Sequence, residues 1–444
     1  MRVIIIGAGL AGTATAWYLR QGGATVTVIE RGEAAAMETS FANAGMLTPS
    51  MADPWNAPGT WRNLLRWIGR EDAPMLLRPS ALPGLLGWGL QFLRHSRTVS
   101  FHRNTLKNVR LALYSLKELQ RLRDVAAIEY DAASVGTLRA CRDQTSLDRA
   151  AALAAFLADH GVAYRVLDRA GLVATEPALA PIAGDLVGGI HYCEDESGDA
   201  HLFTRGLAQR ATECGVEFLY RSEFTGVRLN GSRVSGVEHR LLENRSSLRS
   251  GSAAGTNADH KENAKTNTLD ADAVVLAAGS FTPVLARQLG LRVPVRPVKG
   301  YSITAPVGDW AYPPRIPVSD DHLHAAVTPL GDRIRVAGTA EFTAYDDTLT
   351  PSRLSNLMGL LRAVYPDYAA RLDPATITPW CGFRPVSADG VPILGSTGIE
   401  GLYLNTGQGP LGWTMAAGCG HLLADLILNQ APALDTADYA LARF

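Results

Sequence analysis

The chain has 444 residues, of which 47% are hydrophobic and 19% are charged. This length and composition predict a globular protein with two or more domains and exclude a disordered chain. The 42 basic and 43 acidic residues give a net charge of −1, so the basic excess of a nucleic-acid-binding protein is missing. Five cysteines without a Cys-x-x-Cys pair argue against a disulfide framework or a metal site and indicate a reducing cytoplasm.

The first twenty residues predict a strand, a glycine-rich turn and a helix. The run at 3–6 is apolar at every position, as in a strand buried on both faces of a parallel sheet. Gly7 then allows a tight turn, Gly9 lets the backbone approach a pyrophosphate, and Gly12 lets the next helix pack closely on the strand. We predict that helix over 11–20, with its first N–H groups facing the phosphates.

A second strand at 25–29 and the acid after it complete a βαβ unit. Glu30 follows the glycines at the spacing where a carboxylate accepts hydrogen bonds from a ribose. An acid here favours a free 2′-hydroxyl, and therefore NAD or FAD over NADP. Arg31 follows directly, so the motif by itself leaves NAD and FAD open. The alternative is an ordinary βαβ unit whose glycine turn binds no ligand.

Apolar periodicity predicts further elements along the chain. Asp199 precedes one predicted helix and is placed to cap it. The stretch at 243–267 has almost no apolar residues, so we predict a polar, disordered or extended loop there. The predicted helices span 106–122, 147–160, 201–214 and 411–428, and the predicted strands span 216–220, 273–278 and 402–405.

The pieces of a nucleotide-binding domain are spread from one end of the chain to the other. Such a domain is therefore discontinuous, with a second domain inserted into it. We predict the nucleotide-binding domain over 1–45, 196–228, 270–290 and 378–444, and the second domain over 46–195, 229–269 and 291–377.

Seven strings, spread in register over almost the whole chain, resemble those of one enzyme family. They are GAGLAGTATAWYL, ETSFANAGMLTPSMADPWNAPG, SGDAHLFTRGLA, VVLAAGSFT, PVRPVKGYSIT, GFRPVSADGVPILG and LNTGQGPLGWTMAAG. The chain resembles the small-subunit type of D-amino-acid dehydrogenase, within the FAD-dependent D-amino-acid oxidase and glycine oxidase group. The resemblance implies a mixed α/β fold, with a discontinuous Rossmann-like FAD-binding domain and an inserted antiparallel-sheet substrate domain. It also decides between NAD and FAD, in favour of non-covalent FAD.

The resemblance implies two residues near the substrate. Arg384, in GFRP, matches the arginine that pairs with the substrate carboxylate, because a planar guanidinium suits a carboxylate better than lysine does. Tyr301, in KGYSIT, matches a tyrosine whose hydroxyl donates to the carboxylate or covers the pocket. The alternatives are a structural ion pair for Arg384 and a half-buried strand tyrosine for Tyr301.

The resemblance also implies which residues hold the cofactor. Backbone N–H groups around Asn43 match a loop beside the flavin ring, and the glycine turn before the last helix matches donors near flavin N1 and O2. A polar surface turn and a plain capping loop are the alternatives. Pro410 has no N–H, so only its carbonyl can make a contact. The implied cofactor-binding residues are Gly7, Gly9, Leu10, Ala11, Gly12, Glu30, Arg31, Ser40, Asn43, Ala44, Gly45, Met46, Ala278, Gly279, Gly409, Leu411, Gly412, Trp413 and Thr414.

The activity implied by the resemblance is oxidative deamination of D-amino acids to 2-oxo acids and ammonia. Hydride passes to flavin N5, and the electrons go on to a quinone or another respiratory acceptor. A dehydrogenase for D-hydroxyproline or proline and an oxidase for glycine or sarcosine are alternatives on the same fold. A non-catalytic flavin- or NAD-binding protein is a further alternative, against which Arg384 in GFRP argues.

The segment at 61–97 raises the question of a membrane surface. It mixes tryptophans and leucines with arginines, as interfacial segments do, although an active-site lid or a domain core would also use its apolar residues. No stretch reaches the ~18 consecutive apolar residues that a transmembrane helix needs. We therefore expect a cytoplasmic protein, either free or attached peripherally to the inner face of the cell membrane.

Overall fold

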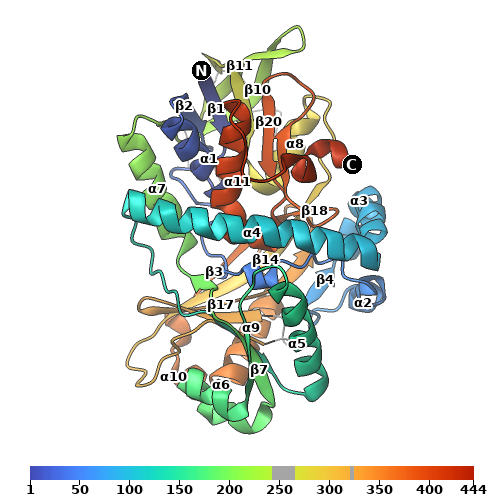
Figure 1. Cartoon of the computed structure of the whole chain (residues 1–444), viewed down its shortest axis with the longest axis vertical. Coiled ribbons are helices and arrows are strands. Elements are labelled where there is room, and N and C mark those ends of the chain that lie inside the picture. The colour runs from blue at the N-terminus through green and yellow to red at the C-terminus, as the bar shows by residue number, and fades with distance from the viewer. Residues whose placement is uncertain (243–265, 321–324) are drawn as a thin grey trace.

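Two large β-sheets organise the protein in the computed structural model, which describes residues 1–242, 266–320 and 325–444. In Figure 1 the sheet that contains β1 (Arg2–Ile6) lies above the long helix α4 (Thr98–Ala126), and β17 (Arg333–Phe342) of the other sheet lies below it. The predicted mixed α/β architecture is confirmed. In the described part of the chain, no helix is both long and apolar enough to cross a bilayer.

The first sheet has six strands in the order β19–β20–β13–β1–β2–β9, and all its pairs are parallel except β19–β20. The four predicted strands of its centre are confirmed, β2 with the predicted boundaries and the other three with one end shifted by one or two residues, and β9 is shorter than the predicted strand at 216–220. Besides β1, the strands are β2 (Thr25–Ile29), β9 (Glu217–Leu219), β13 (Ala273–Leu276), β19 (Ile393–Ser396) and β20 (Leu402–Thr406).

Strand β1 is apolar throughout because each of its faces is covered. Val3 and Ile5 pack in the core under the helices, whereas Ile4 and Ile6 pack toward a small three-stranded sheet on the other face. The strict alternation of side chains along a strand sends neighbours to opposite faces. The covering elements are α1 (Leu10–Gln21), α7 (Ala200–Glu213) and α11 (Gly412–Ile427) on one face, and β10 (Ser222–Asn230), β11 (Arg233–Leu241) and β12 (Thr266–Asp270) on the other.

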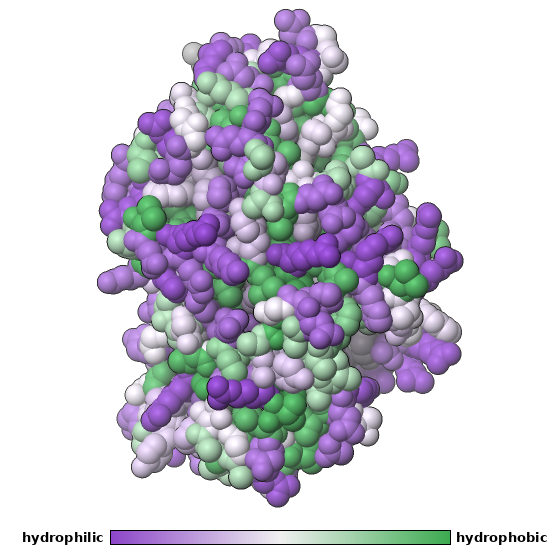
Figure 2. All heavy atoms as spheres, viewed as in Figure 1, coloured by the Kyte–Doolittle hydropathy of each residue, from purple (hydrophilic) through white to green (hydrophobic). Residues whose placement is uncertain are grey.

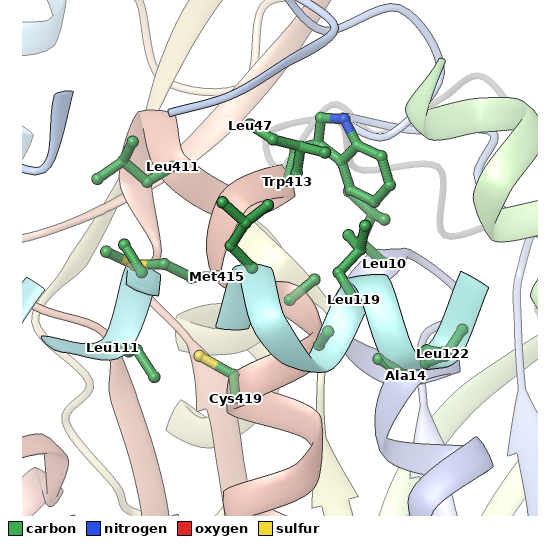
Figure 3. Close-up of a cluster of buried hydrophobic side chains, with 14 of the residues drawn as sticks. Leu10, Ala14, Leu47, Leu111, Leu119, Leu122, Leu411, Trp413, Met415 and Cys419 are labelled. Atoms are coloured by element: carbon green, nitrogen blue, oxygen red, sulfur yellow. The ribbon is translucent and has the colours of Figure 1, made fainter. Parts of the chain in front are cut away.

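Helix α11 packs closely against both α4 and α1, and small residues make both contacts possible. A Cβ on Gly418 would lie 2.7 Å from Cβ of Ser115 in α4, and a Cβ on Gly420 would lie 2.8 Å from the carbonyl carbon of Ala14 in α1. Figure 3 shows the apolar side chains of the three helices meeting at this point, among them Leu119 and Met415. The outer face of α4 is hydrophilic (Figure 2), which explains the amphipathic spacing that predicted this helix.

The second sheet has nine strands in the order β18–β14–β17–β16–β15–β5–β7–β6, with β4 also paired to β17. Its pairs are antiparallel except β15–β5 and β17–β4. One face packs against α9 (Pro351–Val364). Besides β17, the strands are β4 (Met75–Leu77), β5 (Thr137–Cys141), β6 (Arg165–Asp168), β7 (Gly188–Tyr192), β14 (Val295–Pro306), β15 (Val318–Asp320), β16 (Ala325–Leu330) and β18 (Thr378–Ser387).

Two side-chain caps fix helix starts, and the remaining elements complete the fold. Asp199 accepts hydrogen bonds from the backbone N–H groups of His201 and Leu202, which confirms the predicted cap of α7. The predicted helix at 147–160 begins earlier because Asp143 caps it. The remaining elements are α2 (Thr60–Trp67), α3 (Leu82–His95), α5 (Gln144–Ala158), α6 (Arg169–Thr175), α8 (Thr282–Arg287), α10 (Pro366–Arg371), β3 (Met46–Leu47) and β8 (Glu196–Ser197).

The predicted domain boundaries remain a prediction, and two strands pair differently from what these boundaries imply. The prediction places 378–387 with the nucleotide-binding domain, but β18 pairs with β14 in the nine-stranded sheet. It places 229–269 with the substrate domain, but β11 packs with β10 on the face of the six-stranded sheet. Most of the predicted polar loop, 243–265, lies outside the described residues, and its last two residues begin β12.

Candidate active site

The carboxyl ends of β1, β13 and β20 lie side by side, and each is followed by a turn of small residues. Gly7, after β1, has φ of +108°, and a Cβ there would lie 2.8 Å from the carbonyl oxygen of Ala277, after β13. Gly407 and Gly409, after β20, also have positive φ, of +82° and +55°. Only glycine adopts these angles freely. Ligands of open parallel sheets bind at this edge of the sheet.

A cavity of about 940 Å³ follows this edge and continues to the nine-stranded sheet. Every predicted cofactor-binding residue lines it except Gly12, Gly45 and Thr414, and both predicted substrate residues line it as well. The tertiary structure thus brings together segments from residue 7 to residue 413 of the chain.

The three exceptions support segments that line the cavity. A Cβ on Gly12 would lie 1.9 Å from the carbonyl oxygen of Gly7, so this glycine lets α1 pack against the first turn. The carbonyl of Gly45 accepts a hydrogen bond of 2.8 Å from the N–H of Gly198. The Oγ1 atom of Thr414 accepts one of 3.0 Å from the N–H of Thr48.

The N-termini of α1 and α11 both face the cavity. Leu10 and Ala11 of α1 line it, as do Gly412 and Trp413 of α11, and neither helix is capped by the side chain of its own N-cap residue. Only the N–H of Leu10 has a side-chain acceptor in the described first turn of α1, the Oγ of Ser40 at 3.2 Å. First-turn N–H groups have no acceptor inside their own helix. Together with the positive end of the helix dipole, they favour a negatively charged ligand group such as a phosphate.

Glu30, which directly follows β2, lines the cavity. Its Oε2 accepts a hydrogen bond of 2.8 Å from the N–H of Ala8, and its Oε1 accepts one of 2.6 Å from the N–H of Gly32. Burial raises the pKa of Glu30, while these two backbone donors act in the opposite direction. Each carboxylate oxygen keeps a second lone pair, so Glu30 can still accept hydrogen bonds from a ligand hydroxyl.

Arg384 is a cation without a counter-ion at the other end of the cavity. Its Nη1 donates a hydrogen bond of 3.1 Å to the carbonyl oxygen of Thr339, and its Cζ lies 5.7 Å from the ring centroid of Trp55. No ion pair joins it to an Asp or Glu of the described residues. Burial therefore lowers the pKa of Arg384 to about 10. A buried, unpaired guanidinium gains most from a ligand that brings its own carboxylate.

Tyr301 lines the cavity, but its hydroxyl is engaged elsewhere. The Oη donates a hydrogen bond of 2.5 Å to Oε2 of Glu341 and lies 3.0 Å from Oγ1 of Thr350. Burial and the Glu341 carboxylate raise the pKa of Tyr301. A phenol can donate only one hydrogen bond, and Tyr301 donates it to Glu341. This hydroxyl therefore has no donor left for a substrate carboxylate. Of the two predicted roles, the donor role does not fit this structure, and the covering role stays a prediction.

Aromatic residues that the sequence analysis did not single out also line the cavity. Phe281 and Tyr345 stack with their ring centroids 5.0 Å apart, and Arg31 lies over Phe281 at 4.0 Å. Trp380 also lines the cavity, as does Trp55, which lies beside Arg384. Phe281 and Trp55 stand within quoted strings, but nothing in the local pattern of Tyr345 or Trp380 indicates a site.

Cys381 does not line the cavity, although it is three residues from Arg384. Its Sγ donates to the carbonyl oxygen of Asp347 at 3.2 Å. Burial raises the pKa of this thiol to about 11. A protonated thiol outside the cavity is a poor nucleophile, which favours the predicted non-covalent cofactor.

The residues fit a dinucleotide at one end of the cavity and a carboxylate ligand at the other. A Cβ on Gly9 would meet only Oγ of Ser40, at 3.5 Å, so the backbone is open to a close ligand there. The N-terminus of α1, whose N-cap residue is a glycine, suits the pyrophosphate, and Glu30 suits a ribose. Arg384 lies where the same cavity reaches the nine-stranded sheet.

Comparisons with known proteins agree with this geometry. A family model described as FAD dependent oxidoreductase matches residues 2–426. The chain is 42% identical over 444 residues to a D-amino acid dehydrogenase of Granulibacter bethesdensis, covering all of both chains. It is also 42% identical over 444 residues to a D-amino acid dehydrogenase of Methylobacterium nodulans, covering 100% of this chain and 99% of the other.

Solved structures show the same fold at lower sequence identity. Glycine oxidase from Geobacillus kaustophilus superposes with a TM-score of 0.71 at 22% identity, covering 100% of this chain and 99% of the other. L-proline dehydrogenase from P. horikoshii superposes with a TM-score of 0.74 at 18% identity, covering 100% and 97%. The cradle of glycines and helix ends described above therefore belongs to a Rossmann-like FAD-binding fold.

Proposed function

The chain belongs to the FAD-dependent oxidoreductase family and is an enzyme of the D-amino-acid dehydrogenase type, and from that premise we propose that it deaminates D-amino acids oxidatively. The Cα–H and amine of the substrate lose two electrons and two protons to give an imine, which water hydrolyses to a 2-oxo acid and ammonia. Bound FAD supplies the two-electron acceptor, with hydride received at N5.

The unpaired guanidinium of Arg384 is the observation that carries this proposal. We assign it the substrate carboxylate, because charge-assisted bidentate hydrogen bonds to a carboxylate would offset the cost of its burial. Trp55, beside the guanidinium, helps to exclude water. No side-chain base is required if the amine is neutral when the substrate binds, so the role of the chain is to orient the substrate in a dry cavity.

We assign the cofactor to the other end of the cavity. The first turn of α1 holds the pyrophosphate, and Glu30 accepts from the ribose. The loop around Asn43 and the N-terminus of α11 direct backbone N–H groups toward the flavin ring. When FAD is bound, such donors would stabilise negative charge on the ring.

Anaerobic mixing with an amino-acid panel tests the proposed reaction. The purified protein should carry a visible flavin absorbance that bleaches with D-amino acids and stays unchanged with their L-enantiomers. In a separate assay in air, the enzyme supplied with a D-amino acid should reduce an artificial dye much faster than it forms hydrogen peroxide. Bleaching by glycine, sarcosine or cyclic imino acids alone would establish one of the alternative reactions, and rapid peroxide release would refute the dehydrogenase. No bleaching with any amino acid would refute the enzymatic proposal.

We further propose that the electrons pass to a quinone or another respiratory acceptor at the inner face of the cell membrane. Helix α3 exposes Leu86 and Leu90, which are 69% and 71% exposed, and ends close to Arg94 and Arg97. Figure 2 shows apolar side chains among hydrophilic ones on the lobe that contains α2 and α3 in Figure 1. Exposed leucines beside arginines suit the surface of an anionic bilayer.

Sedimentation with anionic lipid vesicles tests the membrane contact. The protein should pellet with the vesicles at low salt, and the double variant Leu86→Glu/Leu90→Glu should stay in the supernatant. Leu229→Glu, at a 46% exposed leucine on β10, is the matched control and should pellet like the parent. A parent protein that stays in the supernatant, or a double variant that still pellets, would contradict this contact.

A further inference from the structure

Four consecutive carbonyl groups of the loop at 42–45 accept hydrogen bonds from distant parts of the chain, the first three of them from the nine-stranded sheet. Ser302 donates from Oγ to the carbonyl oxygen of Ala42 at 2.7 Å, and Thr328 donates from Oγ1 to that of Ala44 at 2.8 Å. Between them, Nη1 of Arg335 lies 3.4 Å from the carbonyl oxygen of Asn43. The N–H of Gly198 binds the fourth carbonyl.

The three side chains share one face of the nine-stranded sheet. Thr328 of β16 pairs directly with Arg335 of β17, and Arg335 pairs directly with Thr304 of β14. Ser302 lies two residues before Thr304 on the same strand, and Thr304 accepts a hydrogen bond of 3.1 Å from Nε of Arg335. Directly paired residues and residues two apart on a strand point to the same side, so this face carries a row of donors.

The donors are buried and their geometry is defined. Ser302, Thr328 and Arg335 are 1%, 0% and 4% exposed. The charge of Arg335 is balanced by Asp199, whose Oδ2 lies 3.3 Å from Nη2 and whose other oxygen caps α7. Arg335 is therefore held from α7 as well as from its own sheet.

A trans peptide is planar, with its carbonyl and its N–H pointing in opposite directions. Because the carbonyls of Ala42 and Asn43 point to the sheet, the N–H groups of Asn43 and Ala44 point away from it. Both residues line the cavity, and neither N–H donates a hydrogen bond to another described residue. The next N–H, of Gly45, donates to Oδ1 of Asn43 at 2.9 Å, which holds that side chain back on the loop.

We propose that Ser302, Arg335 and Thr328 are positioning residues, which bind the carbonyls of the loop at 42–44 and so aim the N–H groups of Asn43 and Ala44 at the flavin. This assignment rests on the proposed place of FAD in the cavity. It goes beyond the contact residues themselves, because none of the three needs to touch the cofactor. The nine-stranded sheet thereby preorganises the loop, and because Arg384 lies on the same sheet, the geometry of the two ends of the cavity is coupled.

Ser302→Ala and Thr328→Val each remove one carbonyl donor and leave the loop sequence unchanged. We expect each variant to hold FAD about 3- to 10-fold more weakly, measured from flavin fluorescence when the holoprotein is diluted, because one ordered hydrogen bond is lost. The visible absorption bands of the remaining bound flavin should shift in the same variants. Thr328→Ser keeps the hydroxyl and should restore both properties toward those of the parent.

Thr282→Val is the matched control, because Oγ1 of Thr282 is buried without a hydrogen-bond partner. It should leave FAD affinity and the flavin spectrum unchanged. If Ser302→Ala and Thr328→Val lower the melting temperature of the protein but hold FAD with parental affinity and spectrum, the residues have a purely structural role and the proposal fails. If FAD affinity falls as expected and no amino acid bleaches the flavin, the positioning role stands and the proposed reaction fails.

Discussion

The guanidinium of Arg384 lies directly across Gly300 in the neighbouring strand. A Cβ on Gly300 would lie 2.1 Å from Nη1 of Arg384 and 2.3 Å from its Cζ. Gly300 itself pairs with Gly382 of β18, so two glycines face each other beside the arginine. The absence of a side chain at Gly300 is what lets the guanidinium rest on the sheet and line the cavity.

Gly300→Ala should therefore displace the substrate-binding arginine without unfolding the protein. Gly300 does not have a positive φ, and the atoms that a methyl group would meet are the far end of a flexible side chain. We expect KM for the amino acid to rise about tenfold, equivalent to about 1.4 kcal/mol, with the melting temperature little changed. Gly359→Ala on α9 is the control, since nothing lies within 4 Å of its added Cβ. A parental KM for Gly300→Ala would contradict the assigned position of Arg384.

Arg384→Met should stabilise the ligand-free protein while it abolishes carboxylate binding. Burial lowers the pKa of Arg384 to about 10, which means that the folded protein holds this charge at a cost. We expect the free energy of unfolding near neutral pH to rise by about 1–3 kcal/mol in the variant. A short carboxylate such as propionate should raise the melting temperature of the parent only. Equal stabilisation of the variant by propionate would place the carboxylate site elsewhere.

Asp195→Asn should remove a pH dependence of stability. The Oδ2 of Asp195 accepts hydrogen bonds from Oγ of Ser50 at 2.5 Å and from Oγ1 of Thr137 at 2.6 Å, and burial raises its pKa from 3.8 to about 7. When the pH lies between these two pKa values, Asp195 is protonated in the folded state and ionised in the unfolded state. Stability of the parent should therefore fall as the pH rises through this interval, by an amount on the order of 2–4 kcal/mol.

Denaturant unfolding across this interval and on to higher pH, well above the folded pKa of Asp195, measures this dependence. The difference in unfolding free energy between Asp195→Asn and the parent should grow with pH and level off above the folded pKa of about 7. Asp309→Asn, at an exposed carboxylate, is the control and should follow the parent. A difference that stays constant across the interval would show that Asp195 does not titrate there.

Gly9→Ala and Gly12→Ala should separate ligand binding from folding. A Cβ on Gly9 would meet only Oγ of Ser40, at 3.5 Å, whereas a Cβ on Gly12 would lie 1.9 Å from the backbone oxygen of Gly7. We expect Gly9→Ala to weaken FAD binding and to leave the melting temperature of the FAD-free protein near that of the parent. Gly12→Ala should lower that melting temperature as well, by overpacking worth about 1–3 kcal/mol. If Gly9→Ala lowered the melting temperature of the FAD-free protein and Gly12→Ala did not, the close approach of α1 to the first turn would be contradicted.

Local patterns were sufficient for the nucleotide-binding half of the protein. The apolar run at 3–6, the turn at Gly7 and the cap at Asp199 are each decided by neighbours in the chain, and each is found where it was predicted. Burial of both faces makes a central parallel strand apolar at every position, so such strands stand out in a sequence. The family strings then point to FAD, a choice that the glycine motif alone leaves open.

The sequence by itself thus determined the parallel strands, their glycine turns, the caps and the kind of cofactor. Only the tertiary structure decided which side chains face the cavity from the nine-stranded sheet. Arg384 reaches it across Gly300, Ser302 binds the loop at Ala42, and the hydroxyl of Tyr301 is bound to Glu341 instead of facing a substrate. The reason is register, since a shift of one residue sends every side chain of a strand to the opposite face. Pairing between strands far apart in the chain sets that register, and a bulge between Lys299 and Tyr301 modifies it, which no local pattern reveals.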